Sequence, residues 1–260
     1  MTKPTARPAL RLYVDQKLEP NQTIELTGDQ AHYLFKVMRR STGDQVGLFN
    51  GKSGEYRAFL EQTSKKAGMA HIDTLVLPAK KRDGSHLSLY IPPIKKGSME
   101  LVVRQATELG VTDIYPTITE HSRSETLRYD RLQAIALEAC EQCERLEPPI
   151  IHPPMPLGQV ISHWSSGEMC IVAAEAGPSI PISMALSGGN LPTSISILIG
   201  PEGGFSPHEL RMLSQTEDFI VVGLGPRILK AETAAIAAIA TVQVLWGDID
   251  ARPEFRGIIA

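Results

Sequence analysis

The stretch Ile195–Ala240 decides the fold, because it holds two apolar strands that each end in a turn with glycine and proline. The first strand, Ile195-Ser-Ile-Leu-Ile199, leads into Gly200-Pro-Glu-Gly-Gly204, and the second, Phe219–Gly223, leads into Leu224-Gly-Pro-Arg-Ile-Leu-Lys-Ala-Glu-Thr-Ala234. Glycine lets a backbone leave a strand sharply and lets another molecule approach it, because no Cβ stands in the way. Ligands of open α/β sheets bind at the carboxyl ends of the strands. The sequence therefore predicts that both turns meet in space and form the functional site.

A helix is expected after each turn. Ser206-Pro-His-Glu209 is typical of a helix start, with Ser206 as the N-cap and Glu209 placed to complete a capping box. In Ala234–Trp246 apolar residues recur at helical spacing, and Gly247 can take the left-handed position that ends a helix. Each turn thus joins a strand to a helix, as in the crossovers of a parallel sheet.

Both turns resemble the C-terminal signatures of the RsmE family, SPOUT-class RNA methyltransferases that methylate N3 of a uridine in small-subunit ribosomal RNA. Two further stretches, Lys96–Val111 and Glu138–Arg145, are similar to the same family. The four stretches occur in the family's order, and the resemblance extends as far as Asp250. It implies a C-terminal SPOUT-type α/β domain with a trefoil knot and a mainly parallel sheet, preceded by a small PUA-like β-barrel.

The order of the expected elements agrees with two domains. Residues up to Leu77 contain mostly short strands, as in a small barrel or sandwich, whereas Gln30–Arg40 has helical spacing. From Leu87 onward strands and helices alternate, which predicts a largely parallel sheet. We expect a PUA-like RNA-binding barrel at residues 1–82, a methyltransferase domain at residues 83–250 and a tail at residues 251–260. The remaining expected strands are Arg11–Val14, Thr23–Leu26, Gln45–Phe49, Glu55–Leu60, Met69–Leu77, Leu87–Ile91, Val111–Ile118 and Met169–Ala174, and the remaining helices are Ser98–Leu109 and Leu127–Cys143.

The charge is distributed unevenly along the chain. The formal net charge is −3, but residues 1–85 hold 14 Lys and Arg against 9 Asp and Glu, whereas residues 86–260 hold 12 against 20. The basic first third, which includes Lys80-Lys81-Arg82 as an expected exposed linker, suits contact with a phosphate backbone. Chance variation among solvated lysines is the alternative interpretation.

Cysteine content and apolar runs indicate the compartment. Three cysteines in 260 residues argue against a disulfide framework and for a reducing environment. Cys140 and Cys143 share a helix face but lack a second pair for zinc, so we expect core cysteines and no metal. Met1–Ala9 lacks the apolar core of a secretory signal, and no apolar run approaches the roughly 20 residues that span a bilayer. The sequence therefore predicts a soluble, cytoplasmic protein.

The resemblance implies S-adenosylmethionine as the cofactor. Backbone N–H and C=O groups of the two turns would hydrogen-bond the adenine edge, and aliphatic side chains would cover its faces. A dinucleotide site is the rival interpretation, but the chain lacks the G-x-G-x-x-G spacing after a first strand. The residues expected to bind the cofactor are Leu198, Ile199, Gly200, Gly203, Leu224, Gly225, Ile228, Leu229 and Thr233.

Methylation of N3 of uracil requires removal of a weakly acidic imide proton, and it benefits from a cation near the uracil oxygens, where negative charge develops. The candidate catalytic residues are Arg11 and Arg227 as cations and Glu175, which, like Glu202, could serve as the base or as a partner for the sulfonium or the ribose hydroxyls. Lys230 is a further cation and Glu202 a further carboxylate. Either glutamate could equally form a salt bridge or complement a helix dipole, and these alternatives remain open.

The resemblance implies RNA contacts from basic residues of both domains, with a solvated surface position as the alternative for each arginine. The chain has Gln105 and Glu147 where the family commonly has basic residues, which weakens that expectation for their two segments. The resemblance also implies a homodimer whose active site lies at the subunit interface. It further implies that this homodimer acts on ribosomal RNA within the assembled small subunit. Two other functions remain open: methylation of another RNA or base atom, and ribosome-associated RNA binding without catalysis. The expected RNA-binding residues are Arg11, Arg39, Arg40, Lys96, Arg123 and Arg145.

Overall fold

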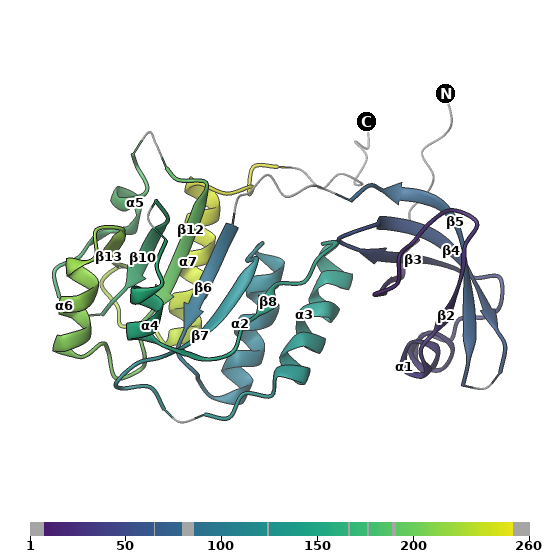
Figure 1. Cartoon of the computed structure of the whole chain (residues 1–260), viewed down its shortest axis with the longest axis horizontal. Coiled ribbons are helices and arrows are strands. Elements are labelled where there is room, and N and C mark those ends of the chain that lie inside the picture. The colour runs from purple at the N-terminus through teal and green to yellow at the C-terminus, as the bar shows by residue number, and fades with distance from the viewer. Residues whose placement is uncertain are drawn as a thin grey trace. The chain divides into compact units, whose positions relative to one another are not determined.

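The chain forms two compact units in a computed structural model that describes residues 8–64, 66–79, 86–123, 125–165, 167–175, 177–188 and 191–251 (Figure 1). The N-terminal unit comprises Met1–Arg82 together with Cys140–Glu147, and the C-terminal unit comprises Asp83–Ala139 together with Pro148–Ala260. The segment Cys140–Glu147 thus belongs to the N-terminal unit, although it is far from that unit's other residues in the sequence. The expected linker Lys80–Arg82 and the tail after residue 251 lie outside the described residues.

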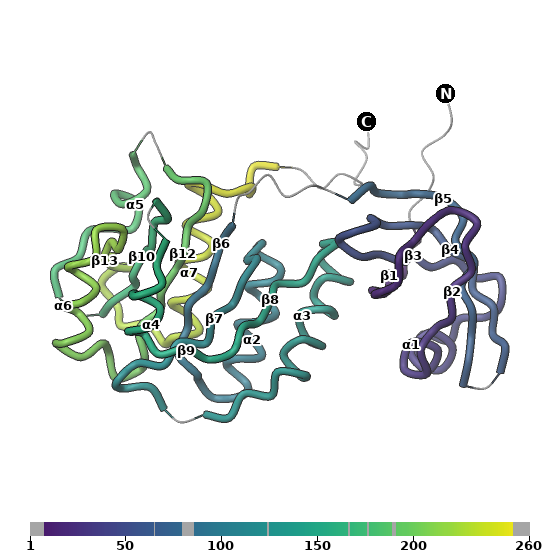
Figure 2. The backbone as a smooth tube through the Cα atoms, in the orientation of Figure 1, coloured from purple at the N-terminus to yellow at the C-terminus, as the bar shows by residue number. Residues whose placement is uncertain are grey.

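The N-terminal unit contains a five-stranded sheet with the order β1-β3-β4-β5-β2, whose curled path Figure 2 shows as a tube. β1 pairs in parallel with β3, whereas the other pairings are antiparallel. Side chains from every strand, including Leu48 and Leu60, form one buried cluster inside the sheet. The strands are β1 (Arg11–Tyr13), β2 (Thr23–Leu26), β3 (Gln45–Asn50), β4 (Gly54–Gln62) and β5 (Gly68–Leu77).

The helical segment of this unit begins and ends earlier than predicted. It consists of α1 (Gly28–His32) and a π-helical turn, η1 (Tyr33–Val37). Thr27 forms a capping box with Gln30 at the start, which satisfies the first free backbone N–H groups. The helix stops before the predicted end because Arg39 adopts the left-handed conformation, with φ of 53°.

The C-terminal unit contains an eight-stranded sheet in which every pairing is parallel, as the alternation of strands and helices predicts. The strand order is β11-β13-β10-β12-β6-β7-β8, with β9 paired to β7. The strands are β6 (His86–Ile91), β7 (Asp113–Ile118), β8 (Ile150–Ile151), β9 (Met155–Pro156), β10 (Met169–Ala173), β11 (Ile180–Pro181), β12 (Ser194–Ile199) and β13 (Phe219–Gly223). The helices are α2 (Lys96–Glu108), α3 (Tyr129–Cys143), α4 (Leu157–Ser162), α5 (Ile182–Ala185), α6 (Pro207–Gln215) and α7 (Ala231–Leu245).

Helices cover both faces of this sheet (Figure 1). On one face, α2, α3 and α7 pack against β6, β7 and β12 in the largest buried cluster. On the other face, α4 and α6 cover β10 and β13 in a smaller cluster. The alanines of α7 allow close packing, since Ala235 and Ala238 are fully buried where this helix runs beside α2. The sequence missed the short elements α4, α5, β8, β9 and β11, which lack a full period of apolar residues.

The order of the last strands differs from their order in the chain. β10 lies between β12 and β13, so the two strands that carry the glycine-proline turns flank a third strand. The carboxyl ends of all three strands therefore meet at one edge of the sheet. The chain then leaves β13 and returns to β12 and β6, where α7 packs. This reordered parallel sheet is the SPOUT-type fold that the resemblance implies.

The two predicted helix starts differ in accuracy. Ser206 caps α6 as predicted: its Oγ accepts from the backbone N–H of Glu209 at 3.1 Å, and its own N–H donates to the Glu209 carboxylate at 2.9 Å. α7 begins at Ala231, before the predicted Ala234, because Lys230 takes the extended N-cap conformation. The last turn of the glycine-proline segment is therefore helical.

Candidate cofactor site

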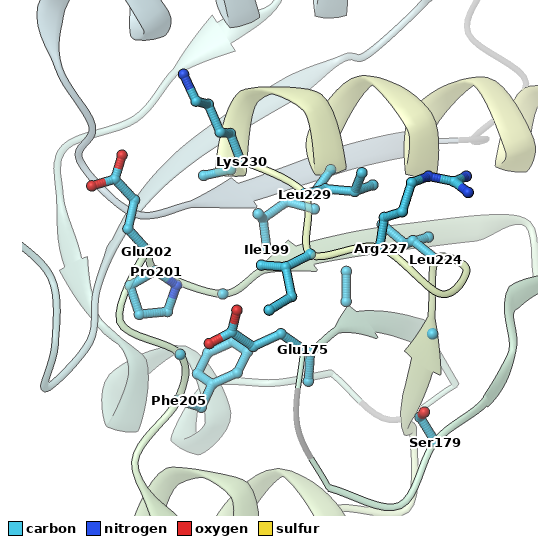
Figure 3. A pocket seen from close by; sticks show the side chains of 18 of the residues that line it. Glu175, Ser179, Ile199, Pro201, Glu202, Phe205, Leu224, Arg227, Leu229 and Lys230 are labelled. Carbon is cyan, nitrogen blue, oxygen red and sulfur yellow. The ribbon is translucent and has the colours of Figure 1, made fainter.

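A cavity of about 470 Å³ lies at the carboxyl ends of β10, β12 and β13. Its volume falls within the roughly 300–1,000 Å³ range of small-molecule sites. Gly200 from the first turn and Gly225 from the second both line it, so the two turns meet as predicted (Figure 3). The segment from Gly223 to Ala231 forms much of one wall.

The glycines keep side chains out of this cavity. Gly225 has φ of +100° and Gly204 has φ of +71°, conformations that other residues rarely adopt. A Cβ on Gly204 would lie 2.8 Å from Oε1 of Glu175, and a Cβ on Gly200 would lie 3.0 Å from the ring of Phe205. Side chains at these positions would displace the groups that shape the cavity.

Most of the residues expected to bind a cofactor lie on the cavity wall, namely Ile199, Gly200, Leu224, Gly225, Ile228 and Leu229. Leu198 does not, because neighbouring strand residues face opposite sides of the sheet and its side chain is buried in the core beside α6. Gly203 lines a second, smaller cavity, and Thr233 is exposed on α7. Ala173, at the end of β10, also lines the cavity but was not predicted from the sequence. Only the position of β10 between β12 and β13 in the sheet could have indicated it.

Charged side chains surround the apolar wall. Glu175, Glu202, Arg227 and Lys230 all line the cavity and are exposed. The Glu175 carboxylate lies close to Gly204, because a Cβ there would be 2.8 Å from its Oε1, and Figure 3 shows Arg227 and Lys230 pointing in different directions from their turn. The site thus offers a carboxylate within the cavity and cations along its margin.

Arg11 lies in the interior of the N-terminal unit, which differs from its expected role as an RNA-contacting or catalytic cation. Its side chain is 4% exposed and pairs with the fully buried Glu55 at 2.9 Å. The guanidinium donates to the carbonyls of Cys140 at 2.6 Å and Arg145 at 3.0 Å, and it lies 3.9 Å from the ring centre of Phe49. Arg11 thus connects the C-terminal end of α3 to Glu55 in β4.

The other residues expected to bind RNA lie in varied surroundings. Arg39 and Lys96 are exposed, while Arg40 and Arg145 are half-buried. Nη2 of Arg123 lies 3.1 Å from the Glu202 carboxylate, at the first glycine-proline turn. At the positions where the family commonly has basic residues, Glu147 packs against Gly51 and Gln105 is half-buried in α2.

The cysteines have the surroundings of core residues. Cys140 and Cys170 are buried and Cys143 is half-buried. Burial raises the pKa of the Cys140 thiol to about 12, which keeps it protonated and unreactive at neutral pH. Among the residues that the structure describes, no three His, Cys, Asp or Glu side chains gather as metal ligands, and no helix is long and apolar enough to cross a membrane.

Family models match both units of the chain. An RNA methyltransferase domain matches residues 81–243, and an RNA methyltransferase PUA domain matches residues 26–68. The chain is 34% identical over 237 residues to ribosomal RNA small subunit methyltransferase E of Rickettsia conorii, covering 90% of this chain and 95% of that protein. It is 32% identical over 243 residues to the protein of the same name from Synechocystis sp., covering 91% and 78% of the two chains.

Two solved structures are similar in fold to this chain. A Legionella pneumophila protein described as a methyltransferase, solved with bound SAM, is 29% identical with a TM-score of 0.79, covering 92% of this chain and 98% of that one. Ribosomal RNA small subunit methyltransferase E from Neisseria gonorrhoeae, bound to S-adenosyl methionine, is 27% identical with a TM-score of 0.79, covering 92% and 99%.

The fold, the cavity at its strand ends and the matching domains define the class, so the chain belongs to the RNA methyltransferases. Identity of 34% over nine tenths of the chain narrows that class. The chain belongs to the family of ribosomal RNA small subunit methyltransferase E.

Proposed function

We propose that the protein transfers the methyl group of S-adenosylmethionine to N3 of a specific uridine in small-subunit ribosomal RNA. The observation that carries this proposal is the meeting of two glycine-proline turns in one cavity of about 470 Å³. The relatives from Rickettsia conorii and Synechocystis sp., both named for ribosomal RNA small subunit methylation, support the substrate. The Legionella pneumophila and Neisseria gonorrhoeae structures, solved with SAM, support the cofactor.

The lining of the cavity fits this cofactor. Ile199, Leu224 and Leu229 provide aliphatic surface for the two faces of an adenine. Backbone groups of the turns around Gly200 and Gly225, which both line the cavity, can hydrogen-bond its edge, because glycine has no side chain of its own to cover them. Exposed Ile228, at 84%, adds apolar surface that a bound ligand or a partner subunit would cover.

The proposed chemistry assigns separate roles to charged residues of this site. S-adenosylmethionine supplies a methyl group already activated by its sulfonium, so the chain's task is mainly to position the acceptor. Glu175 accepts the N3 proton of uracil, and Arg227 stabilises the negative charge that develops on the uracil oxygens. Arg11 keeps a structural role, because its guanidinium is buried against Glu55 and backbone carbonyls.

We also propose that the protein acts as a homodimer on the assembled small ribosomal subunit. Val244 and Leu245, at 56% and 42% exposed, leave apolar surface at the end of α7. A second copy that covers such surface would bury it from water. Light scattering of the purified protein tests this, and a monomer at micromolar concentration would contradict it.

Labelled cofactor tests the proposed reaction. Incubation of the protein with methyl-labelled S-adenosylmethionine and unmethylated small ribosomal subunits should label a single uridine, at N3, when the RNA is mapped by mass spectrometry. Calorimetry with S-adenosylmethionine alone should show binding. Label on another base or atom would correct the acceptor, and absence of transfer to any RNA would refute the proposed activity.

A further inference from the structure

A second cavity, of about 230 Å³, lies at the carboxyl edge of the same sheet, over β12, β6 and β7. It is smaller than the roughly 300–1,000 Å³ of sites that hold a whole small molecule. Its size suits one part of a larger ligand that extends beyond it. The lining comes from three loops: Pro92, Pro93, Ile94 and Lys95 after β6; His121, Ser122 and Arg123 after β7; and Pro201, Glu202 and Gly203 after β12.

The first glycine-proline turn separates the two cavities. Pro201 and Glu202 line both of them. A Cβ on Gly203 would lie 3.2 Å from Cβ of His121 on the second cavity's side, and a Cβ on Gly204 would lie 2.8 Å from Oε1 of Glu175 on the first cavity's side. Two successive glycines thus let His121 and Glu175 approach the turn closely from its two sides, so the wall between the cavities is thin.

Cationic side chains give the second cavity its character. Lys95 and Arg123 line it, and Arg123 forms an ion pair with Glu202. The side chains of this pair are 60% and 40% exposed, so solvent screens it and Arg123 can exchange Glu202 for another anion. Nδ1 of His121 donates to the carbonyl of Gly204 at 2.9 Å, which ties this loop to the wall. A guanidinium and an ammonium around a small polar cavity are suited to a phosphate group.

We infer that the second cavity is the acceptor subsite, in which Lys95 and Arg123 hold a phosphate of the target nucleotide while its base extends over the Gly200–Gly204 wall toward the cofactor cavity. This inference rests on the proposed function, since it states where the RNA substrate of the same reaction binds. It accounts for the thinness of the wall between the two cavities. It also gives Glu202 a role: the carboxylate holds Arg123 in place until a phosphate replaces it.

The alternative is that the Arg123 pair with Glu202 only stabilises the turn. The two interpretations predict different results for the cofactor. Loss of a merely structural pair would alter the wall of the first cavity and weaken cofactor binding. Loss of a phosphate contact would weaken RNA binding and leave the cofactor affinity unchanged.

The test uses the full-length variants Arg123→Ala and Lys95→Ala, with Arg128→Ala as the matched control. Arg128 is another exposed arginine of the same unit, at 66%, paired with Asp130. Each protein is titrated with S-adenosylmethionine by calorimetry and with small ribosomal subunits in binding and methyl-transfer assays. We expect the Kd and KM for ribosomal subunits to rise about tenfold for Arg123→Ala, with unchanged cofactor affinity. The dependence of log Kd on log salt should lose about one unit of slope.

Each other outcome has a defined meaning. Unchanged RNA binding in Arg123→Ala, or an equal loss in Arg128→Ala, would overturn the inference. Weakened cofactor binding in Arg123→Ala would overturn it in favour of the structural pair. Failure of the wild-type protein to methylate any RNA would refute the proposed function separately, and RNA binding by the variants would still decide whether the second cavity holds a phosphate.

Discussion

The cofactor cavity and the core around Arg11 show opposite ways in which a sequence secures a structure. The cavity depends on positions that lack side chains, since Gly200 and Gly204 leave room that a Cβ would fill. The core of the N-terminal unit depends on one charged side chain, because Arg11 joins Glu55 to carbonyls at the end of α3. Substitutions should therefore separate the two regions: changes in the first should affect binding, and changes in the second should affect stability.

Replacement of Arg11 should give the largest effect. Arg11→Ala breaks the buried ion pair with Glu55, and the loss of one partner of such a pair costs roughly 3–5 kcal/mol of unfolding free energy. Urea unfolding should show this loss, while the cofactor affinity of the remaining folded protein stays unchanged. Arg57→Ala is the control, because Arg57 pairs with the partly exposed Asp73. This variant should lose at most about 1 kcal/mol of unfolding free energy. Normal stability together with a reduced kcat in Arg11→Ala would restore the catalytic role expected from the sequence.

Glu175→Gln tests whether a change at the cofactor cavity affects catalysis without affecting stability. The amide keeps the size of the side chain but accepts a proton poorly, so kcat should fall about 100-fold if Glu175 is the base. Calorimetry should show a cofactor affinity and an unfolding free energy close to wild type. Glu217→Gln, at an exposed position after α6, provides the control. A kcat within twofold of wild type would exclude Glu175 as the base.

The same contrast explains what the sequence could predict. The cavity turns and the Ser206 cap were predictable, because glycine, proline and capping residues act on the backbone next to them. The place of Arg11 was not, since it bonds a carbonyl 129 positions away and a buried arginine looks like an exposed one in sequence. Leu198 and Ile199 could not be told apart because both faces of the strand are buried, and even Ser196, on the same face as Leu198, is only 4% exposed.

Long-range arrangement accounts for the remaining differences. The position of β10 between β12 and β13 places Ala173 at the cavity, and nothing local in the sequence of β10 indicates that order. The second cavity draws its lining from loops after β6, β7 and β12, which are adjacent only in the folded sheet. Strand order had to be known before either feature could be inferred.

Gly200→Val should have a smaller effect than the two preceding changes and should act mainly on binding. The added side chain would start 3.0 Å from the ring of Phe205 and project into the lining of the cavity, so the Kd for S-adenosylmethionine should rise about tenfold or more. Gly158→Ala is the control, since a Cβ there meets nothing within 4 Å. Unchanged cofactor affinity in Gly200→Val would place the cofactor elsewhere.

Ser206→Ala should give the smallest effect and test whether the two kinds of region are independent. The change removes the hydroxyl that accepts from the Glu209 N–H, which costs about 1 kcal/mol and lowers Tm by about 2–4 °C. Ser206→Thr keeps the hydroxyl and should recover most of this loss. Because only Phe205 separates Ser206 from the Gly200–Gly204 turn, cofactor calorimetry on Ser206→Ala shows whether α6 also fixes that turn. An affinity equal to wild type means that the glycines and Phe205 shape the cavity by themselves, whereas a weaker affinity means that helix capping contributes to the binding site.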